Sequence, residues 1–493
     1  MNMTHFNLLD LILLSQNQSH ISLYILFNFD DTYNQLSLQT YINRLLFIAI
    51  RLLQKQIRNS TLINNIIKLK IKRYLFVPKK NIFKMLTALS KILNQHQPEY
   101  KASTNKLSQT GEIIYKALIG DIGGTNIRLR LISFTKHARI PTVIKSSENM
   151  KTNQFNSFTD AIAKFLDGVQ EIDWPEFAGI GMAGAVLDNQ NTLTNAPHWP
   201  KINGNELAKQ FKIKKFQLFN DFEVASYACL NLTKEEVIQI NTAQEIPNKI
   251  KTVCGAGTGL GVANIVPYPK YPESTEYVYQ VWPGEGGHGS FAPVTKTQQE
   301  FVDFLLKYFP ERTQIALEYA FVGPAIPYMY AFFKNRHQGQ ELALEKIEGA
   351  HHSFDVDEYH RMKRSKDEKE REKANFPSHL VFEYGVAAKD AICEEVVKFF
   401  VSIYETAIGD MAVRSLPYSG IYLVGSMSLA VLPYIQKNQA TFMKEYYDNR
   451  PYLKDVFDKI PIYIVKEKDI GLDGAYVVTR QMVQSYLSQV PAQ

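Results

Sequence analysis

Cysteine is scarce in this chain of 493 residues, which contains only Cys229, Cys254 and Cys393. No two of them stand at the spacing of a zinc site or a thioredoxin-like redox motif. We therefore expect neither a disulfide framework nor a cysteine-bound metal. Three unpaired cysteines favour a reducing compartment, and we expect the cytoplasm.

Glycine and glutamate are absent from residues 1–84, a segment rich in Ile, Asn and Leu. Eleven Lys and Arg residues stand there against three acids, so this segment carries a net charge of +8. The whole chain carries +6, which leaves −2 for everything after residue 84. The body of the protein is thus not basic, and nucleic acid is not an expected partner.

Long apolar runs are also missing from this first segment. Its longest uncharged run, residues 11–29, is interrupted by six polar residues, so we expect no membrane span. The segment also lacks the charged region, short apolar run and small-residue cleavage site of a secretory signal. An organelle transit peptide remains an alternative, because acidic residues are few. We expect residues 1–112 to form an N-terminal extension, disordered or not part of the mature protein. Our hypothesis for residues 1–84 is that they are upstream sequence translated ahead of a true start at Met85.

Two stretches have the pattern strand, glycine-rich turn, strand. The first turn is Gly120–Asn126, and apolar residues from Ile127 to Leu131 then alternate with arginines, the period of a half-buried strand. Glycine permits positive φ, so such a turn can direct several backbone N–H groups at one anion. For this stretch alone, an ordinary hairpin turn remains the alternative.

The second turn is Gly255–Gly261. It differs from a dinucleotide fingerprint because the third glycine position holds Leu260 and a strand, not a helix, follows. Neither turn has the Lys-Ser/Thr ending of a P-loop. Two similar hairpins predict a clamp that holds a polyphosphate from both sides, with Thr125 and Thr258 adding hydroxyl donors.

Strands and helices alternate between these turns, which indicates an α/β protein. One expected strand, residues 216–219, ends at Asn220 and Asp221, and a helix is expected from 222 to 230. An acid at this junction lies where α/β sheets bind ligands, although a helix N-cap explains it equally well.

Other polar residues stand in or beside glycine-rich turns. Glu285 and His288 share the loop Trp282–Phe291, where a carboxylate and an imidazole suit adjacent hydroxyls of a polyol better than a metal. Glu318 precedes a Gly-Pro turn and a helix start. A buried strand ends at Gly425 and Ser426, where a ribose or planar group can approach the backbone.

Two further segments are assigned to scaffold. Residues 335–376 contain a mixed-charge run and few apolar residues, so we expect a solvated insertion with helical tendency. A core-facing apolar stripe then predicts one long helix from about 382 to 413.

Taken in order, these motifs resemble bacterial-type glucokinase, in the version that also occurs in some protists. The motifs that carry the resemblance are Gly120–Asn126, Asn220–Phe222, Gly255–Gly261, Gly284–His288, Glu318 with Gly323-Pro324, Val424–Ser426 and Asp469–Ala475. The resemblance implies the two-domain ribonuclease H-like fold of actin-like ATPases. A small α/β domain (113–231, completed by 467–490) and a larger α+β domain (232–466) would flank a cleft.

The resemblance implies ATP-dependent phosphorylation of glucose at its 6-hydroxyl, the first step of glycolysis. Asp221 is then the general base, and the sugar would be bound by Asn195, Asn220, Asp221, Glu285, His288 and Glu318. The nucleotide would be bound by Asp121, Gly123, Gly124, Thr125, Asn126, Gly257, Thr258, Gly259, Gly425 and Ser426. Asp121 would orient hydrated Mg²⁺ through water, with no direct protein ligand to the metal.

The expected partners are therefore glucose and ATP, and we expect a homodimer. A kinase for mannose, fructose or glucosamine remains an alternative, since these sugars differ from glucose by few contacts. A non-catalytic sugar-binding regulator is a further alternative. The chain departs from the family pattern at Phe321–Ala325 and at Gly425-Ser426, and the cysteine cluster of the related ROK sugar kinases is absent.

Overall fold

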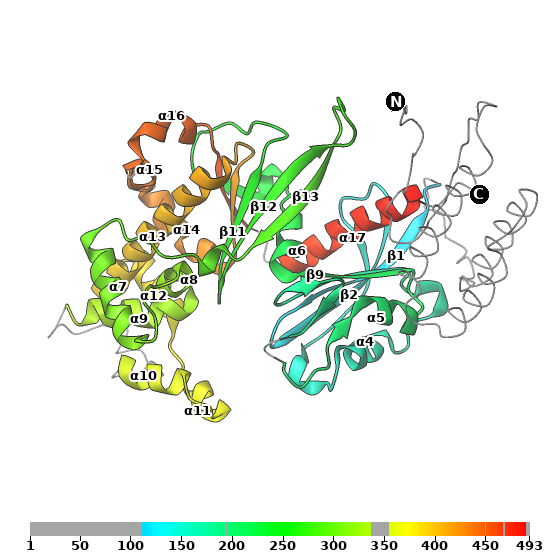
Figure 1. Cartoon of the computed structure of the whole chain (residues 1–493), viewed down its shortest axis with the longest axis horizontal. Coiled ribbons are helices and arrows are strands. Elements are labelled where there is room, and N and C mark those ends of the chain that lie inside the picture. Colours follow the sequence, from blue (N-terminus) through cyan, green and yellow to red (C-terminus); the bar gives the residue numbers. More distant parts are fainter. Residues whose placement is uncertain (1–110, 194–195, 337–353, 449, 467–468, 490–493) are drawn as a thin grey trace, which may run out of the picture. The chain divides into compact units, whose positions relative to one another are not determined.

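The computed structural model describes residues 111–193, 196–336, 354–448, 450–466 and 469–489. Two earlier expectations fall outside these ranges: the N-terminal extension up to residue 110, and Asn195 as a sugar ligand. The described chain contains two six-stranded sheets with helices packed on them, and a small three-stranded sheet, β6-β7-β8 (Figure 1). The bounds of its strands are Val186–Leu187, Gln190–Asn191 and Ile202–Asn203.

The first large sheet has the order β3-β2-β1-β5-β9, with β4 also paired to β2. Its strands are β1 (Ile114–Ile122), β2 (Asn126–Thr135), β3 (Thr142–Ser146), β4 (Met150–Lys151), β5 (Phe177–Met182) and β9 (Lys215–Asn220). Strands β1, β5 and β9 run parallel, whereas β1 and β2 form an antiparallel hairpin. The turn predicted at Gly120–Asn126 is thus confirmed as the connection of this hairpin.

Helices cover both faces of this sheet. On one face α4 (Phe158–Leu166) and α5 (Gly204–Gln210) pack against Leu118 and Ile180. On the other face lie α6 (Asp221–Ala228) and the C-terminal helix α17 (Ile470–Gln489), which packs against β1, β5 and α6 (Figure 1). Because both faces are buried, β1 is apolar on both sides, as parallel strands usually are.

The second large sheet has the order β10-β15-β14-β11-β12-β13. Its strands are β10 (Val237–Gln239), β11 (Lys251–Ala256), β12 (Leu260–Pro269), β13 (Tyr277–Gly284), β14 (Ile421–Val424) and β15 (Ile462–Val465). Strands β11 and β12 form the second predicted hairpin, while β11, β14 and β15 are parallel. The predicted turn at Gly255–Gly261 is therefore also confirmed.

A large aromatic and aliphatic core joins this sheet to most of the remaining helices. These helices are α7 (Lys296–Tyr308), α8 (Leu317–Phe321), α9 (Ile326–Lys334), α12 (Ser378–Val386), α13 (Ala391–Ser415), α14 (Ser426–Lys437), α15 (Gln439–Asp448) and α16 (Lys454–Phe457). A single helix over 382–413 is wrong, because the chain breaks between α12 and α13. Ala388 has φ +52° there, and the Asp390 side chain caps α13 by accepting from the Cys393 N–H.

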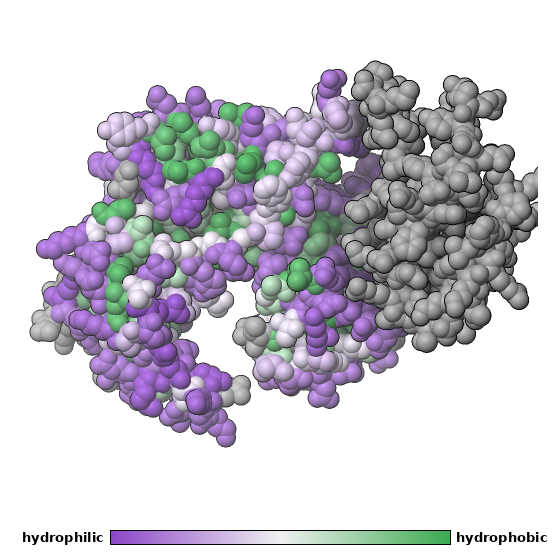
Figure 2. Space-filling view, in the orientation of Figure 1, coloured by the Kyte–Doolittle hydropathy of each residue, from purple (hydrophilic) through white to green (hydrophobic). Residues whose placement is uncertain are grey.

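The charged insertion is helical where it is described, in α10 (Val356–Lys363) and α11 (Glu368–Lys373). Its outer surface is hydrophilic (Figure 2). It is better anchored than the sequence indicated, since Phe354 and Phe376 pack on each other and on Tyr330. His360 of α10 also bonds Tyr328, with 2.8 Å between its Nδ1 and the tyrosine hydroxyl. Of the helices in the described ranges, none is long and apolar enough to cross a membrane.

Candidate active site

The first glycine turn joins β1 to β2 and is closed by its own backbone. The Gly123 N–H donates to the Asn126 carbonyl at 3.0 Å. Thr152 supports the turn from the side, because its N–H donates to the Thr125 carbonyl at 3.1 Å and its hydroxyl to the Gly124 carbonyl at 2.7 Å. Thr125 and Asn126 are exposed. The turn therefore presents its outer backbone and the Thr125 side chain to solvent.

The second glycine turn, between β11 and β12, is held by two outside groups. A Glu318 carboxylate oxygen accepts from the Leu260 N–H at 2.9 Å, and the Gly257 carbonyl accepts from the Gly323 N–H at 2.8 Å. A side chain at Gly257 would meet no atom within 4 Å, so this turn is open on its outer side. Glu318, an expected sugar ligand, thus also fixes the second glycine turn.

The reason we gave for the glycines in these turns is wrong. No glycine of either turn has a positive φ. Two of them instead leave room for the ring of Phe222, which lies about 2.5 Å from where a Cβ at Gly255 would be and 2.2 Å from one at Gly261. Phe222 follows Asp221 in α6, so this close packing holds the start of α6 against the second turn.

Asp221 is the first residue of α6 and is partly buried. Asn220, not Asp221, caps the helix, because its carbonyl oxygen accepts from the N–H groups of Phe222 and Glu223, both at 3.0 Å. The Asn220 amide nitrogen donates to the Gly184 carbonyl at 3.0 Å. The capping explanation for Asp221 is therefore wrong, and its second carboxylate oxygen is available for chemistry.

Burial raises the pKa of Asp221 to about 6, with smaller contributions from the negative charges of Asp121 and Glu285. Hydrogen bonding to the Phe222 N–H, at 2.8 Å from the carboxylate, opposes part of this rise. Burial also raises the pKa of Asp121, and Arg128 counteracts it. Asp221 is therefore close enough to feel the charges of both Asp121, at the first turn, and Glu285, in the loop after β13.

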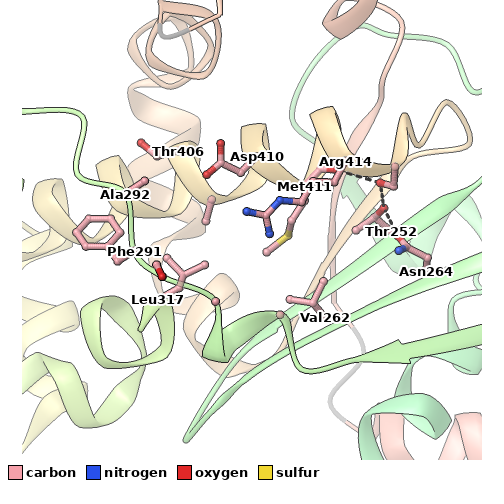
Figure 3. A pocket seen from close by; sticks show the side chains of 15 residues that line it. Thr252, Val262, Asn264, Phe291, Ala292, Leu317, Thr406, Asp410, Met411 and Arg414 are labelled. Carbon is pink, nitrogen blue, oxygen red and sulfur yellow. Dashed lines mark hydrogen bonds between the residues drawn. The ribbon is translucent and has the colours of Figure 1, made fainter. Parts of the chain in front are cut away.

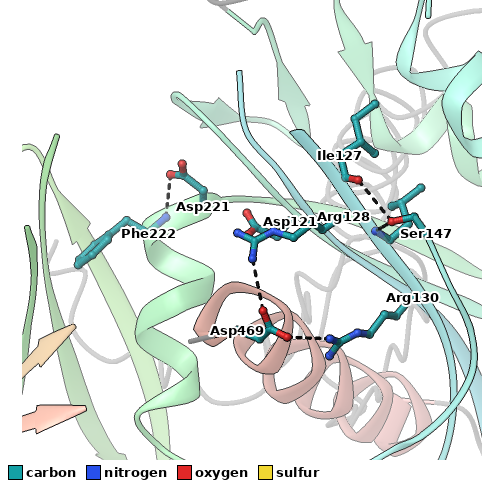
Figure 4. A network of polar contacts seen from close by, with 9 residues as sticks. Asp121, Ile127, Arg128, Arg130, Ser147, Asp221, Phe222 and Asp469 are labelled. Atoms are coloured by element: carbon teal, nitrogen blue, oxygen red, sulfur yellow. Dashed lines mark hydrogen bonds and ion pairs between the residues drawn. The ribbon is translucent and has the colours of Figure 1, made fainter. Parts of the chain in front are cut away.

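A chain of ion pairs leads from Asp121 to the C-terminal helix (Figure 4). Arg128 lies 2.6 Å from the Asp121 carboxylate and 3.5 Å from Asp469, just before α17. Arg130 completes the chain at 2.9 Å from Asp469. Gly471, in the first turn of α17, allows this approach, since a Cβ there would lie 2.5 Å from the Asp121 carboxylate.

Glu285 and His288 lie in the loop after β13. Their side chains are 3.7 Å apart and mostly exposed, at 79% and 60%. The loop rests on the second turn at Gly287, where a Cβ would lie 2.5 Å from the Leu260 carbonyl. Glu318 contacts the same residue, Leu260, so three of the expected sugar ligands are held around one turn.

Gly425 ends β14 and begins α14 with a φ of +96°, a conformation that favours glycine. A side chain there would lie 2.8 Å from the Ala256 carbonyl at the end of β11. Ser426 is exposed beside it. The expected nucleotide residues between β14 and α14 therefore lie next to the second glycine turn.

A family model described as glucokinase matches residues 118–482. This chain belongs to the glucokinase family. Curated relatives of the family include glucokinases of Nostoc sp., 27% identical over 73% of this chain and 97% of the relative, and of Synechocystis sp., 26% identical over 74% and 98%.

Solved structures support the fold. A glucokinase from an Antarctic psychrotroph superposes with a TM-score of 0.55 at 22% identity, covering 74% of this chain and 99% of the other. The glucokinase of Balamuthia mandrillaris, solved with glucose, gives 0.55 at 18% identity, covering 80% and 99%. The chain thus has the actin-like ATPase type of kinase fold expected from its motifs.

Sequence reasoning missed two parts of this site. Arg128 was read only as the polar half of a strand alternation, and Asp469 only as part of a family motif. The ion pairs that join them connect residues far apart in the chain, and the Arg128 to Asp121 pair crosses a hairpin. The one available signal was the pair of arginines on the same face of β2.

Proposed function

We propose that this family member transfers the terminal phosphoryl group of ATP to the 6-hydroxyl of glucose, with Asp221 as the general base. The observation that carries the assignment is the position of Asp221, held by Phe222 against the second turn and coupled to Asp121 beside the first. A carboxylate with a pKa of about 6 is ionised at neutral pH and still basic enough to accept a proton.

In the proposed step the O6–H bond breaks and its proton goes to the Asp221 carboxylate. The O6 lone pair forms the new O–P bond, and the bond from the phosphorus to the ADP oxygen breaks, so ADP leaves with the negative charge. Phosphoryl transfer of this kind depends mainly on positioning and on offsetting charge. The two glycine turns would supply backbone N–H groups to the phosphates.

The residues fit a hydrated Mg²⁺, which usually keeps several waters and takes one or two carboxylates. Asp121 offers one carboxylate beside the first turn and is already matched by a cation, Arg128. When bound with the nucleotide, Mg²⁺ would offset phosphate charge. We assign its outer-sphere contact to Asp121.

Glu285, His288 and Glu318 are the proposed sugar ligands, supported by their common attachment to the second turn. One oxygen of Glu318 is used by the Leu260 N–H, which leaves the other for a hydroxyl. The side-chain oxygen of Asn220 caps α6, and its side-chain nitrogen donates to the Gly184 carbonyl. We therefore assign Asn220 a positioning role in addition to sugar contact. Asn195 stays a prediction, since it lies outside the described residues.

Domain boundaries, compartment and assembly are also proposals. The packing of α17 on β1 and β5 supports a small domain of 113–231 completed by 467–490, with 232–466 as the larger one. Three buried, unpaired cysteines support a reducing cytoplasm. The homodimer is testable by light scattering on the purified chain.

A sugar panel tests the activity. The purified chain is assayed by coupled ADP formation with glucose, mannose, fructose and glucosamine in turn. Glucose should give the highest kcat/KM. A higher value for another hexose would change the substrate assignment, and no ADP formation with any sugar would favour the non-catalytic regulator.

A further inference from the structure

A hollow of about 630 Å³, counting the space at its open mouth, lies between α13 and the loop after β13 (Figure 3). One side is formed by α13 and the other by Gly286, the loop residues Gly289–Ala292, Leu317 and the start of β12. None of the residues assigned to sugar or nucleotide lines it.

The hydroxyl groups of the hollow already donate to protein acceptors. Thr252 bonds to the Asn264 carbonyl oxygen at 2.8 Å, Ser290 donates to Gln314 at 2.8 Å, and Ser415 donates to the Met411 carbonyl at 2.9 Å. Thr406 donates to the Ser402 carbonyl at 3.1 Å. A ligand here would therefore meet few free hydroxyl donors.

Two donors remain. Among the described residues, neither the Arg414 guanidinium nor the Asn264 amide nitrogen has a hydrogen bond or ion pair. Figure 3 shows Arg414 and Met411 extending from α13 toward the side formed by Leu317 and Val262. The acid of the hollow, Asp410, is already paired with Arg450, so the charge of Arg414 is not offset by it.

From these contacts we infer that the hollow is a binding site for a small organic anion. Its carboxylate or phosphate group pairs with Arg414 and accepts from Asn264, and its apolar body packs on Met411, Leu317 and Val262. Arg414 is exposed, so water satisfies its donors when the hollow is empty, and an acceptor-rich, negatively charged group can replace that water. The apolar walls require a body larger than an inorganic ion.

The walls of the hollow are tied to the proposed sugar ligands. The Leu317 N–H donates to the Gly289 carbonyl at 2.8 Å, and the Phe291 N–H to the Ile315 carbonyl at 2.9 Å. Gly286 and Gly289 flank His288 in sequence, and Leu317 precedes Glu318. A ligand in the hollow thus contacts the backbone that positions Glu285, His288 and Glu318, which makes it an effector of sugar affinity. This coupling rests on the proposed function.

Calorimetric titration of the full chain with benzoate and with phenyl phosphate, without ATP or sugar, tests the site. Benzyl alcohol is the neutral control. We expect at least one anion to bind in the millimolar range or tighter, and Arg414→Gln to weaken it about tenfold or more, as for a lost charge-assisted hydrogen bond. Arg414→Lys keeps the charge and should retain part of the affinity, and Asn264→Ala should weaken binding in a chain with Arg414 intact.

Preference for benzoate or phenyl phosphate distinguishes a carboxylate from a phosphate ligand. Equal binding by benzyl alcohol, equal binding by folded Arg414→Gln, or no anion binding would overturn the site. Coupling is tested separately from the glucose KM with and without the bound anion, where we expect KM to change and kcat to remain within about twofold. An unchanged KM at saturating anion would refute the effector role, whereas loss of the proposed activity would leave the binding result standing.

Discussion

The Arg128 guanidinium lies 2.6 Å from the Asp121 carboxylate and also reaches Asp469, 3.5 Å away. One side chain of β2 thus joins the end of β1, at the first glycine turn, to the residue that precedes the C-terminal helix. Asp121 is mostly buried, with 15% of its side chain exposed, whereas Arg128 is half exposed. Arg128 therefore compensates the charge of a mostly buried carboxylate at the proposed nucleotide site.

Replacing Arg128 should weaken nucleotide binding more than sugar binding. In Arg128→Gln the Asp121 carboxylate loses its counter-charge, and we expect the KM for ATP to rise about tenfold, equivalent to about 1.4 kcal/mol. Arg128→Lys keeps the charge and should lie between this variant and the parent. Steady-state kinetics with each substrate varied checks this. A rise confined to the glucose KM would contradict the assignment.

Replacing the proposed base should abolish turnover. Asp221→Asn cannot accept the hydroxyl proton, and we expect kcat to fall about 10²- to 10⁴-fold, the usual range for a general base. Glucose affinity, measured by titration, should change little. Glu223→Gln on the same helix is the matched control and should keep most of the activity. Near-normal turnover in Asp221→Asn would refute the assignment.

The same variant should remain folded. Asp221 has its pKa raised from 3.8 to about 6 in the folded chain. Its contribution to stability is present below pH 3.8 and is lost as pH rises through about 6, because the unfolded chain ionises more easily. At neutral pH Asp221→Asn should thus be at least as stable as the parent. Thermal unfolding of both proteins at several pH values checks this and separates lost chemistry from lost structure.

Activity should follow the ionisation of Asp221. Below pH 6 the carboxyl is increasingly protonated and cannot act as a base, so kcat/KM should fall about tenfold for each pH unit. Above that pH this limb should be flat. A pH profile at saturating ATP checks this, with unfolding followed in parallel. A profile with no acid limb between pH 5 and 7 would count against a base of this pKa.

Removing the Glu285 carboxylate should affect the sugar. Glu285→Ala loses a charged acceptor for a hydroxyl, and we expect the glucose KM to rise about 10- to 100-fold, as for a lost hydrogen bond to a charged group. The ATP KM should stay near that of the parent. Glu273→Ala, in the turn between β12 and β13, is an exposed control. An unchanged glucose KM would remove Glu285 from the sugar site.

A buried acid outside the site should control stability at high pH. Glu405 of α13 is 2% exposed, and burial, together with the nearby Glu445 carboxyl, raises its pKa to about 11. Below pH 4.5 the Glu405 carboxyl holds its proton in both the folded and the unfolded chain, so its burial then costs no ionisation free energy. The free energy of unfolding decreases as pH rises from 4.5 toward 11, because Glu405 ionises readily only in the unfolded chain.

Glu405→Gln cannot ionise and should remove this decrease. We expect its melting temperature to match the parent near pH 4.5 and to exceed it increasingly toward pH 9. The shift would be about 2–4 °C for each kcal/mol regained, a scaling for domains of about 150–250 residues. Glu394→Gln, an exposed acid on the same helix, should show no such trend. Calorimetric scans at these pH values check this, and a constant difference across pH would contradict it.

Much of the local structure around the proposed site was predictable because its signals are local. Glycine turns between period-two strands, and an acid between a strand and a helix, are read from a few neighbouring residues. Contacts made only in the folded chain were not predictable. The Arg130 to Asp469 pair spans 339 residues, and the ring of Phe222 beside Gly255 and Gly261 depends on how α6 packs against the second hairpin.

The break before α13 shows a different limit. An apolar stripe continued through residues 382–413, so periodicity alone predicted one helix. The stripe persists because α12 and α13 pack on each other at Gly385, where a Cβ would lie 2.3 Å from the Cys393 carbonyl. Two helices with one buried side have the same apolar pattern as one continuous helix. In the sequence, the sign of a new helix is Asp390, a residue type that favours the N-cap and that caps α13 in the structure.

The ring of Phe222 in the space left by Gly255 and Gly261 also limits how the site can move. Sliding α6 along the second turn would either open a void of ring size or push the ring into backbone. The Asp221 carboxylate and the second turn are therefore expected to move as one rigid unit. Because β9, which leads directly into α6, lies in the same sheet as β1, the carboxylate is also tied to the hairpin that carries the first turn.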